Sequence, residues 1–326
     1  MRVSSCNLTI RAAAEAYLAH QRALGRGYAR EERVLDGLID FLIQSNYVDL
    51  DHPGFESWCN FEGHLGANGR RSRQFVIRNF CLYRRRNEPD CFVPDPNYFP
   101  RPQPCCIPVL VEPEQIGRML ALTNGMASVP VSPLRPAVLR LAIVLLYTSG
   151  LRRGEVIRLA LQDVEPQAGV LRICESKFHK SRLIPLSSGG LKELHRYLSQ
   201  RLIPSFDRRP SSPLLCNFAK GKLRSYTGTG LSQGIHALFD AAGVRDNDGR
   251  RPRIHDLRHS FALQALMRWY REGVDVQSRL PHLALYMGHV SIKSTAYYLR
   301  FVPSLAALAS ERFERRFGHL IEEERL

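Results

Sequence analysis

Long apolar runs are missing from this 326-residue chain, and the longest spans only residues 141–147. A helix that crosses a bilayer needs roughly 20 apolar residues, so the sequence predicts no membrane partner. The N-terminus also lacks the basic and then apolar layout of a secretion signal. The apolar fraction of 44% is that of a globular protein. We therefore expect a cytoplasmic protein.

Paired metal-ligand motifs are missing as well. The eight cysteines include no C-x-x-C pair, the spacing that zinc ribbons and knuckles require. Cys105 and Cys106 are neighbours and make a poor ligand pair. No cluster of aspartate and glutamate is visible that could hold magnesium. The sequence therefore predicts no metal and no cofactor.

Basic residues are in clear excess. Lysine and arginine number 46 against 31 acidic residues, which gives a formal net charge of +15. Such an excess attracts polyanions and favours nucleic acid or an acidic membrane surface as partner. A merely soluble basic protein is the alternative. The charge is uneven, because residues 1–110 carry a net +2 and residues 111–326 a net +13.

Proline divides the chain into two domains. Residues 88–113 contain eight prolines, which fix φ and remove backbone donors, so no helix is expected there. We interpret residues 91–110 as a proline-rich linker. It separates an N-terminal domain over residues 1–90 from a second domain over residues 111–326.

The N-terminal domain is predicted to be helical. Apolar residues recur at helical spacing over residues 12–24 and 31–43, with glycines between them. A third helix is predicted over residues 70–86, which include seven arginines and no acid. One side of its helical wheel is apolar, and the other holds Arg71, Arg78, Arg85 and Arg86. A solvated face is the ordinary explanation, but the absence of acids favours a helix that tracks DNA phosphates.

The second domain is predicted to be mainly α-helical with a small antiparallel β-sheet. Apolar periodicity predicts helices over residues 114–122, 136–147, 154–161, 191–202, 232–242, 255–271 and 304–317. The helix over 136–147 is apolar nearly all round, which indicates a core helix. Two β-rich runs over 170–174 and 182–186 flank the polar tip S-K-F-H-K and predict a hairpin.

A set of spaced residues in this domain carries chemistry. Arg152 follows the core helix in T-S-G-L-R-R-G-E, and His255 and Arg258 lie in R-I-H-D-L-R-H-S. His289 lies in M-G-H, and Tyr298 follows nine residues later. Guanidinium groups are always charged and bind two oxygens in a fork. Arg152 and Arg258 therefore suit a phosphodiester that gains negative charge under attack.

Tyr298 is the candidate nucleophile of this set. A phenol has a pKa of about 10, so nearby arginines must favour the phenolate and a histidine must accept the proton. The attack would form a phosphotyrosine ester, which conserves the bond energy for rejoining. Lys177 at the hairpin tip is the candidate acid for the leaving 5′ oxygen, with Lys180 as its rival. Each residue alone is usually structural, and only the ordered set is specific.

The ordered set resembles the tyrosine recombinase (phage integrase) family over nearly the whole chain. The resemblance implies six catalytic residues, namely Arg152, Lys177, His255, Arg258, His289 and Tyr298. It implies supporting roles for Glu155 and Asp163, which match acidic positions that brace the first arginine, and for His259. It also implies that residues 1–90 form a core-binding, SAM-like DNA-binding domain and residues 111–326 the catalytic domain.

Some features depart from the family pattern. Arg153 doubles Arg152, and Tyr297 precedes Tyr298. The stretch between residues 258 and 289 is longer than the family leads us to expect, which leaves delivery of Tyr298 in cis or in trans open.

The resemblance implies a metal-independent, site-specific DNA recombinase that acts through a 3′-phosphotyrosine intermediate. Its implied partners are double-stranded DNA with specific recombination sites, further copies of the chain in a tetramer, and accessory recombination proteins. Four protomers would exchange strands through a Holliday junction, and a C-terminal helix over residues 305–321 would dock into a neighbour. Integration, excision or transposition of a mobile element is the favoured task, in a prokaryotic cell where the bound protein associates with the nucleoid.

Three other functions stay open on this reading. A type IB topoisomerase would use the same chemistry to relax supercoiled DNA without a special site. A non-catalytic DNA-binding regulator would share the fold but would have no need of all six residues. A metal-dependent nuclease would lose its activity to a chelator.

Overall fold

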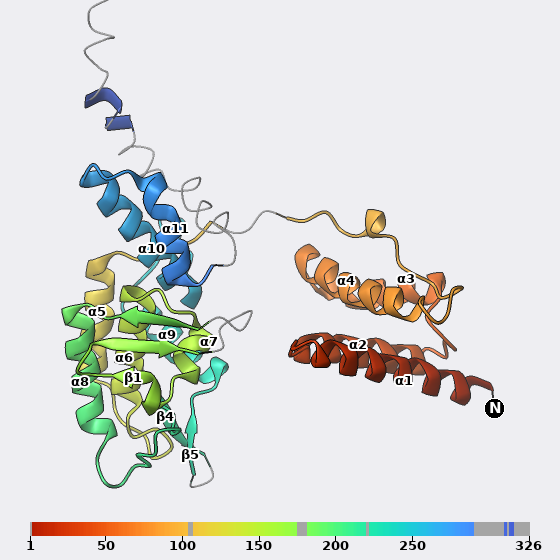
Figure 1. The fold of residues 1–326 in the computed structure, drawn as a ribbon, viewed down its shortest axis with the longest axis horizontal. Helices are drawn as coiled ribbons and strands as arrows, with labels where there is room; N and C mark the ends of the chain where they lie inside the picture. The colour runs from red at the N-terminus through yellow and green to blue at the C-terminus, as the bar shows by residue number, and fades with distance from the viewer. Residues whose placement is uncertain are drawn as a thin grey trace, which may run out of the picture. The chain divides into compact units, whose positions relative to one another are not determined.

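The computed structural model describes residues 2–103, 107–174, 181–219, 222–289, 310–311 and 313–315. It is mostly helical with two small antiparallel sheets (Figure 1), which confirms the predicted fold class. The chain divides into two compact units, Met1–Cys106 and Ile107–Leu326. Within the described residues, no helix combines the length and the apolar character needed to cross a bilayer.

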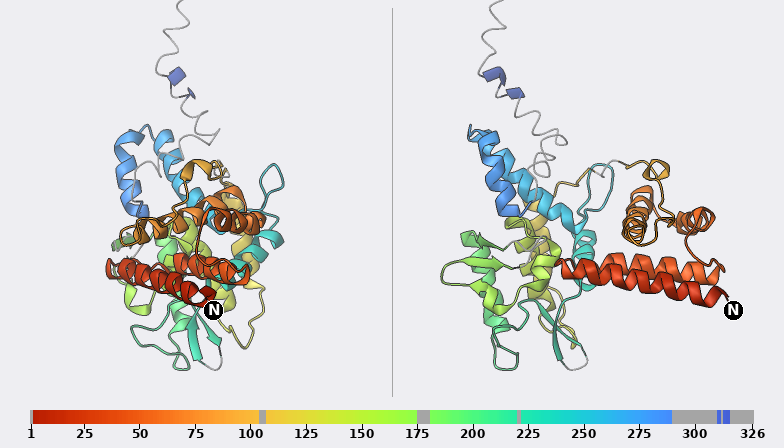
Figure 2. Two further views of the ribbon diagram at one scale, coloured as in Figure 1. Left: turned by 90° about the vertical axis from the view of Figure 1, so that its right-hand side faces the viewer. Right: turned by 45° about the vertical axis from the view of Figure 1, so that its right-hand side comes forward.

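The first unit is a small helical bundle. Its helices are α1 (Arg2–Ala23), α2 (Ala29–Gln44), α3 (His52–Phe61) and α4 (Ala67–Arg84), with one-turn 3-10 helices η1 (Glu62–His64) and η2 (Pro96–Tyr98). Helices α1 and α2 lie side by side (Figure 2). Gly25, with a φ of +77°, follows the end of α1. Leu35 and Leu38 of α2 are fully buried with Ile77 and Phe80 of α4, as their helical spacing predicts.

The basic side of α4 holds the extended segment that follows it. Arg71, Arg78 and Arg85 each donate a hydrogen bond to a backbone carbonyl of that segment, at Pro100, Pro94 and Cys91 respectively. Proline lacks an N–H, so such a segment cannot form a regular backbone ladder, and the guanidinium groups supply donors instead. Phe99 is buried in the core of this unit. Residues 91–100, predicted to belong to a linker, therefore pack on the first unit.

The second unit is built around the apolar helix α6. Its helices are α5 (Pro113–Asn124), α6 (Arg135–Thr148), α7 (Arg153–Arg158), η3 (Leu161–Asp163), α8 (Ser188–Arg201), α9 (Gly228–Ala241), α10 (Ile254–Arg271) and α11 (Val276–Met287). Helix α6 contacts α5, α7, α8, α9 and α10. Every residue from Leu141 to Leu146 is buried, so the predicted core helix is confirmed.

The larger sheet contains the predicted hairpin. Its strands are β1 (Val164–Glu165), β2 (Val170–Ile173) and β3 (Arg182–Pro185), antiparallel in the order β1-β2-β3. Ile173 pairs with Arg182 at the end of β2 and β3 that lies next to the connecting segment. Ile184 is buried and Leu183 is exposed, so the alternation of a strand places Arg182 on the inner face with Ile184.

Two helices and one hairpin are the main elements that were not predicted from the sequence. Helix α3 has proline and glycine in its first turn, and α11 contains Pro281. Proline disfavours a helix interior, so neither sequence was interpreted as a helix. The hairpin of β4 (Cys216–Ala219) and β5 (Lys222–Ser225) was also missed. The long stretch after Arg258 consists of the rest of α10, a turn at Gly273 and α11. Only residues 310–311 and 313–315 of the helix predicted over 304–317 are described, and these are helical.

Candidate active site

The site begins where the core helix α6 ends. Gly150 has a φ of +57°, and a Cβ added there would lie 2.4 Å from Cδ1 of Phe261. Only glycine fits such a position. Arg152 then adopts extended backbone as the residue before α7. The glycine turn therefore places an arginine directly after the core helix.

Arg258 lies on α10, one helical turn after His255, and is only 1% exposed. Its Nη1 donates to the carbonyl oxygen of Gly150, and its Nη2 donates to that of Met287 at 2.6 Å. Burial of a guanidinium costs free energy unless hydrogen-bond acceptors surround it. The carbonyl oxygens of Gly150 and Met287 are two of these acceptors. Arg258 thus joins the turn before Arg152 to the end of α11.

The C-terminal end of α11 brings three arginines together. Arg182, Arg258 and Arg152 donate to the consecutive carbonyl oxygens of Tyr286, Met287 and Gly288, at 2.8, 2.6 and 2.6 Å respectively. The two preceding carbonyls accept the N–H groups of Gly288 and His289, which is a Schellman motif. The last carbonyls of a helix lack partners within it and carry partial negative charge. Guanidinium groups satisfy them here, and His289 follows at once.

Glu155, in the first turn of α7, holds two of these arginines. Its side chain is 1% exposed and accepts hydrogen bonds from Arg152 Nη1 at 2.8 Å and Arg182 Nη2 at 2.9 Å. It also accepts the backbone N–H of Arg152 at 2.9 Å. Burial alone would raise the pKa of this carboxyl, but the bonds from Arg182 and Arg152 lower its pKa to about 2. Glu155 therefore braces Arg152 as an ionised carboxylate.

The histidines of the site favour the neutral form. Desolvation, and then the charges of Arg258 and Arg152, lower the pKa of His289 to about 4. Desolvation and Arg258 also lower the pKa of His255 to about 4, although this residue is exposed at the surface. Desolvation and His255 lower the pKa of His259 to about 3, and the two rings meet edge to face with centroids 4.6 Å apart. A neutral imidazole can accept a proton.

Two residues near Arg152 are used elsewhere. Arg153 donates to the hydroxyl of Ser232 on α9 at 2.8 Å, so Arg152 is the member of the doubled pair that enters the site. Asp163 accepts the N–H of Ala160 at 2.9 Å and closes η3. Within the described part of the chain it does not bond to Arg152. Of the two acids predicted to brace this arginine, Glu155 is the one that does so.

Several predicted site residues lie outside the described residues. They are Lys177, Lys180 and Tyr298, together with the neighbouring Tyr297. The structure thus brings together Arg152, Arg258, His255, His259 and His289, with Glu155 behind them.

Sequence reasoning missed Arg182 as a residue of this site. The available signal was the alternation of β3, because Arg182 shares a face with the apolar Ile184. A charged residue on the inner face of a strand needs a buried partner. The identity of that partner, Glu155, depends on a contact across 27 residues and could not be derived from local spacing.

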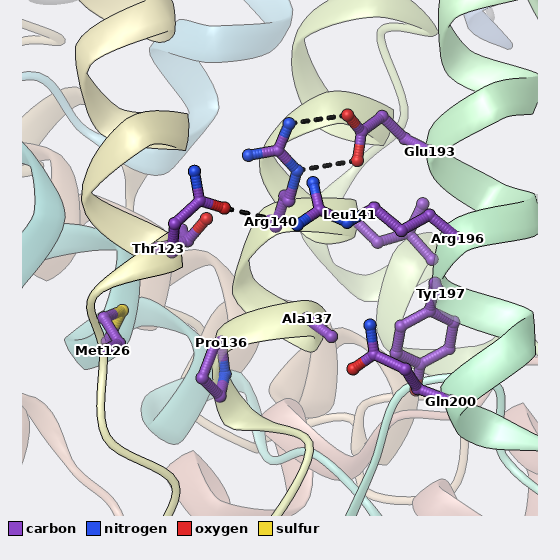
Figure 3. Close-up of a pocket in the computed structure, with 11 residues that line it drawn as sticks. Thr123, Met126, Pro136, Ala137, Arg140, Leu141, Glu193, Arg196, Tyr197 and Gln200 are labelled. Carbon is purple, nitrogen blue, oxygen red and sulfur yellow. Dashed lines mark hydrogen bonds and ion pairs between the residues drawn. The ribbon is translucent and has the colours of Figure 1, made fainter.

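A pocket of about 310 Å³ lies at the other end of α6 and is separate from this site (Figure 3). Its polar side chains bind one another, since Arg140 makes two hydrogen bonds to Glu193 at 2.7 and 2.6 Å. The 14 residues of α6 span about 20 Å. We assign this pocket to the packing of α5, α6 and α8, because Arg140 pairs with Glu193 and Arg196 donates to the amide oxygen of Asn124.

The arrangement is suited to stabilising a dianionic phosphorane-like centre. Arg152 and Arg258 lie at one helix end, and the nearby histidines are neutral. Fixed guanidinium donors in a partly buried site stabilise developing charge more strongly than water does. A neutral histidine beside them can accept a proton from a hydroxyl group.

Comparison with known sequences finds integrases and recombinases. The sequence profile of the phage integrase family matches residues 111–303. A protein of Sinorhizobium fredii that carries the name integrase/recombinase y4rB is 34% identical over 314 residues, which cover 95% of this chain and 98% of that protein. Tyrosine recombinase XerD of Xanthomonas campestris is 31% identical over 167 residues, 49% of this chain and 46% of XerD.

Solved structures share the fold. XerH site-specific recombinase bound to a palindromic difH substrate aligns with a TM-score of 0.62 at 18% identity, over 86% of this chain and 78% of XerH. The Tn1549 transposon integrase in complex with a circular intermediate DNA aligns with a TM-score of 0.60 at 16% identity, over 92% of this chain and 99% of the integrase.

Proposed function

Because this chain belongs to the phage integrase family of tyrosine recombinases, we propose that it is a site-specific DNA recombinase. It cleaves and rejoins DNA strands through a covalent 3′-phosphotyrosine intermediate. The observation that carries this proposal is the meeting of Arg152, Arg258 and His289 at the end of α11. Two guanidinium groups and a neutral imidazole at one place match the needs of a phosphodiester under attack.

The reaction would proceed by direct displacement at phosphorus. The hydroxyl oxygen of Tyr298 attacks, and its proton passes to a neutral histidine, His289 or His255. Arg152 and Arg258 stabilise the charge that develops on the non-bridging oxygens. The bond from phosphorus to the 5′ oxygen breaks as the bond to Tyr298 forms. The ester then keeps the strand available for attack by a 5′ hydroxyl of another strand.

Protonation of the leaving 5′ oxygen falls to a lysine in this proposal. Lys177 is our candidate, with Lys180 as the rival, and both precede β3 in the sequence. Strand β3 begins at Arg182, which is bonded to Glu155. The sheet that carries this lysine segment is therefore fastened to the same carboxylate that braces Arg152.

DNA is the proposed partner of both units. The net +13 of residues 111–326 provides attraction that is independent of sequence. In the first unit we propose that α4 and the two residues after it face the phosphates through Arg71, Arg78, Arg85 and Arg86. One carbonyl bond uses one or two of the five N–H donors of a guanidinium, so holding the proline-rich segment is compatible with this role. We also propose a tetramer on two DNA sites that moves a mobile element.

A covalent adduct tests the proposal directly. The protein would be incubated with nicked suicide substrates made from the DNA that flanks its gene, and adducts would be resolved on denaturing gels. Tyr298→Phe should bind the DNA but form no adduct, because it lacks the attacking oxygen. The matched control Tyr297→Phe should form the adduct as the wild type does. An adduct that persists in Tyr298→Phe would refute the assigned nucleophile.

Supercoil relaxation separates the proposed recombinase from a type IB topoisomerase. A type IB topoisomerase would relax plasmid DNA that lacks any recombination site, whereas the proposed recombinase depends on its own site. Binding without adduct formation on any substrate would instead support a non-catalytic regulator.

A further inference from the structure

We infer that Arg182 is a positioning residue of the active site, which sets the geometry of Arg152 and of the turn at His289 together. This inference rests on the proposed recombinase function. Arg182 is the first residue of β3 and its side chain is 10% exposed. It lies five residues after Lys177 in the sequence.

The hydrogen bonds of Arg182 run in two directions. Its Nη1 and Nη2 donate to the two carboxylate oxygens of Glu155 at 3.1 and 2.9 Å, which is a bidentate pair. Its Nε donates to the carbonyl oxygen of Tyr286 at 2.8 Å. One rigid guanidinium plane therefore joins the brace of Arg152 to the last turn of α11.

Glu155 acts as a shared anion between two guanidinium groups. Arg152 Nη1 and Arg182 Nη1 both donate to its Oε1, at 2.8 and 3.1 Å. The carboxylate is nearly inaccessible to water, so its position depends on these donors. Without Arg182 the carboxylate of Glu155 would lose its bidentate partner. The position of the carboxylate would then be less fixed, and so would the orientation of the Arg152 side chain that binds it.

The turn at Gly288 depends on the same guanidinium. A Cβ on Gly288 would lie 2.9 Å from Nη1 of Arg182 and 3.4 Å from Nη1 of Arg152. Both arginines thus pack against the backbone that leads into His289. Arg182 binds the carbonyl oxygen of Tyr286, and Arg152 binds that of Gly288. These two hydrogen bonds fix the backbone that precedes His289.

Substitution of Arg182 should therefore reduce cleavage more than binding. We expect Arg182→Ala to lower the rate of adduct formation on a suicide substrate by about 10- to 100-fold, the order that a small displacement of catalytic groups costs. Affinity for DNA, measured by gel shift, should change by less than about threefold. Arg182→Lys keeps the charge but not the fork, so it should recover only part of the rate.

The matched control is Arg172→Ala on the neighbouring strand β2. Arg172 pairs with Glu165, and both side chains are about half exposed, so its loss should leave the adduct rate unchanged. Thermal unfolding of each variant reports whether it is folded. If Arg182→Ala does not fold, Arg182→Lys decides the question.

Two further readouts distinguish positioning from a merely structural role. The charge of Arg182 is one of those that lower the pKa of His289, so the acid limb of the rate profile should move to higher pH in Arg182→Ala and stay in place in Arg172→Ala. In a Glu155→Gln background the effect of Arg182→Ala should shrink, because both act through one contact.

The outcomes also separate this inference from the proposed function. If the wild type forms no adduct, the recombinase proposal fails irrespective of Arg182. If the wild type forms the adduct and Arg182→Ala matches it in rate and pH profile, this inference is wrong. A defect that disappears with a 5′-thio leaving group would likewise overturn it, because Arg182 would then act only through the lysine that protonates the leaving oxygen.

Discussion

Arg152 and Gly288 are 136 positions apart in the chain and are joined by a 2.6 Å hydrogen bond from Nη2 to the carbonyl oxygen. Arg258 binds the carbonyl one residue earlier, and Arg182 the one before that. The end of α11 is therefore an assembly point, where three arginines from three segments are oriented by consecutive backbone acceptors. His289 takes its place from the same turn.

Substitution of Gly288 by alanine tests this assembly point. Its φ is +64°, and a Cβ would lie 2.9 Å from Nη1 of Arg182. Gly273 is a matched control, since its φ is +72° but an added Cβ meets nothing within 4 Å. Both alanine variants should lose about 1–2 kcal/mol in the free energy of unfolding from backbone strain. Only Gly288→Ala should also lose adduct formation, measured on suicide substrates, and equal cleavage by the two variants would contradict the prediction.

Arg152 and Arg153 should behave differently although they are neighbours. Arg152→Ala removes a guanidinium that lies in the site, and we expect the rate of strand cleavage to fall by about 100- to 1000-fold, as for the loss of one charge-stabilising donor. Arg153 bonds to Ser232 on α9, so Arg153→Ala should cleave at nearly the normal rate. Single-turnover kinetics with saturating protein would measure both. A larger defect in Arg153→Ala would show that the roles are reversed.

Lys177→Ala should slow strand cleavage more than it weakens binding. A leaving 5′ oxygen needs a proton, whereas a 5′ sulfur leaves without one. The defect of Lys177→Ala should therefore vanish on a substrate with a 5′-thio leaving group. A defect that survives this exchange would exclude Lys177 as the acid, and Lys180→Ala would then be measured in the same way.

Stability should fall on the acid side of neutrality. The pKa of His289 is lowered to about 4 and that of His259 to about 3 in the folded protein, below the unfolded value of about 6.5. The unfolded chain therefore binds more protons between these limits. The free energy of unfolding should be level above about pH 6.5 and should decrease as pH falls from 6.5 towards 4, by up to about 1.4 kcal/mol per pH unit for each histidine.

Chemical denaturation at a series of pH values would measure this slope. Glu155, with its pKa lowered to about 2, should add to the loss only below about pH 4.5. His289→Gln should reduce the slope between pH 6.5 and 4, and the contribution of His259 should remain. An unchanged slope in that variant would mean that another group is responsible.

The arginines of α4 give a prediction about the first unit. Arg78 holds the carbonyl of Pro94, so Arg78→Ala should raise amide hydrogen exchange in residues 91–100. Arg86 is exposed and lies over the ring of Tyr83, so Arg86→Ala should leave that exchange unchanged.

The same two variants test phosphate contact. Each arginine that binds a phosphate should, when removed, weaken binding to all sequences alike and reduce the salt slope by about one. A changed sequence preference would instead indicate contact with bases.

Local sequence was sufficient to predict most helices and strands, but not those in which proline or glycine interrupts the apolar periodicity. The apolar helix α6 and the hairpin of β2 and β3 follow from periodicities that are intact over the whole element. Helix α11 contains Pro281 and α3 begins with proline and glycine, so their patterns were broken where packing overrides propensity. In α4 the seven-residue spacing of arginines was visible, but their carbonyl partners at Pro94 and Pro100 were not.

The sequence by itself determined which residues we propose as catalytic, because the order of arginine, histidine and tyrosine motifs is visible in residue types and spacing. Tertiary structure alone decided how the described arginines and histidines among them meet. It placed Arg152 in the site and bonded Arg153 to Ser232. It made Glu155, and not Asp163, the acid that binds Arg152, and it added Arg182 to the site. The physical reason is that a buried guanidinium must find acceptors wherever the fold supplies them. Here the fold supplies the carbonyls at the end of α11, which no local pattern in the chain specifies.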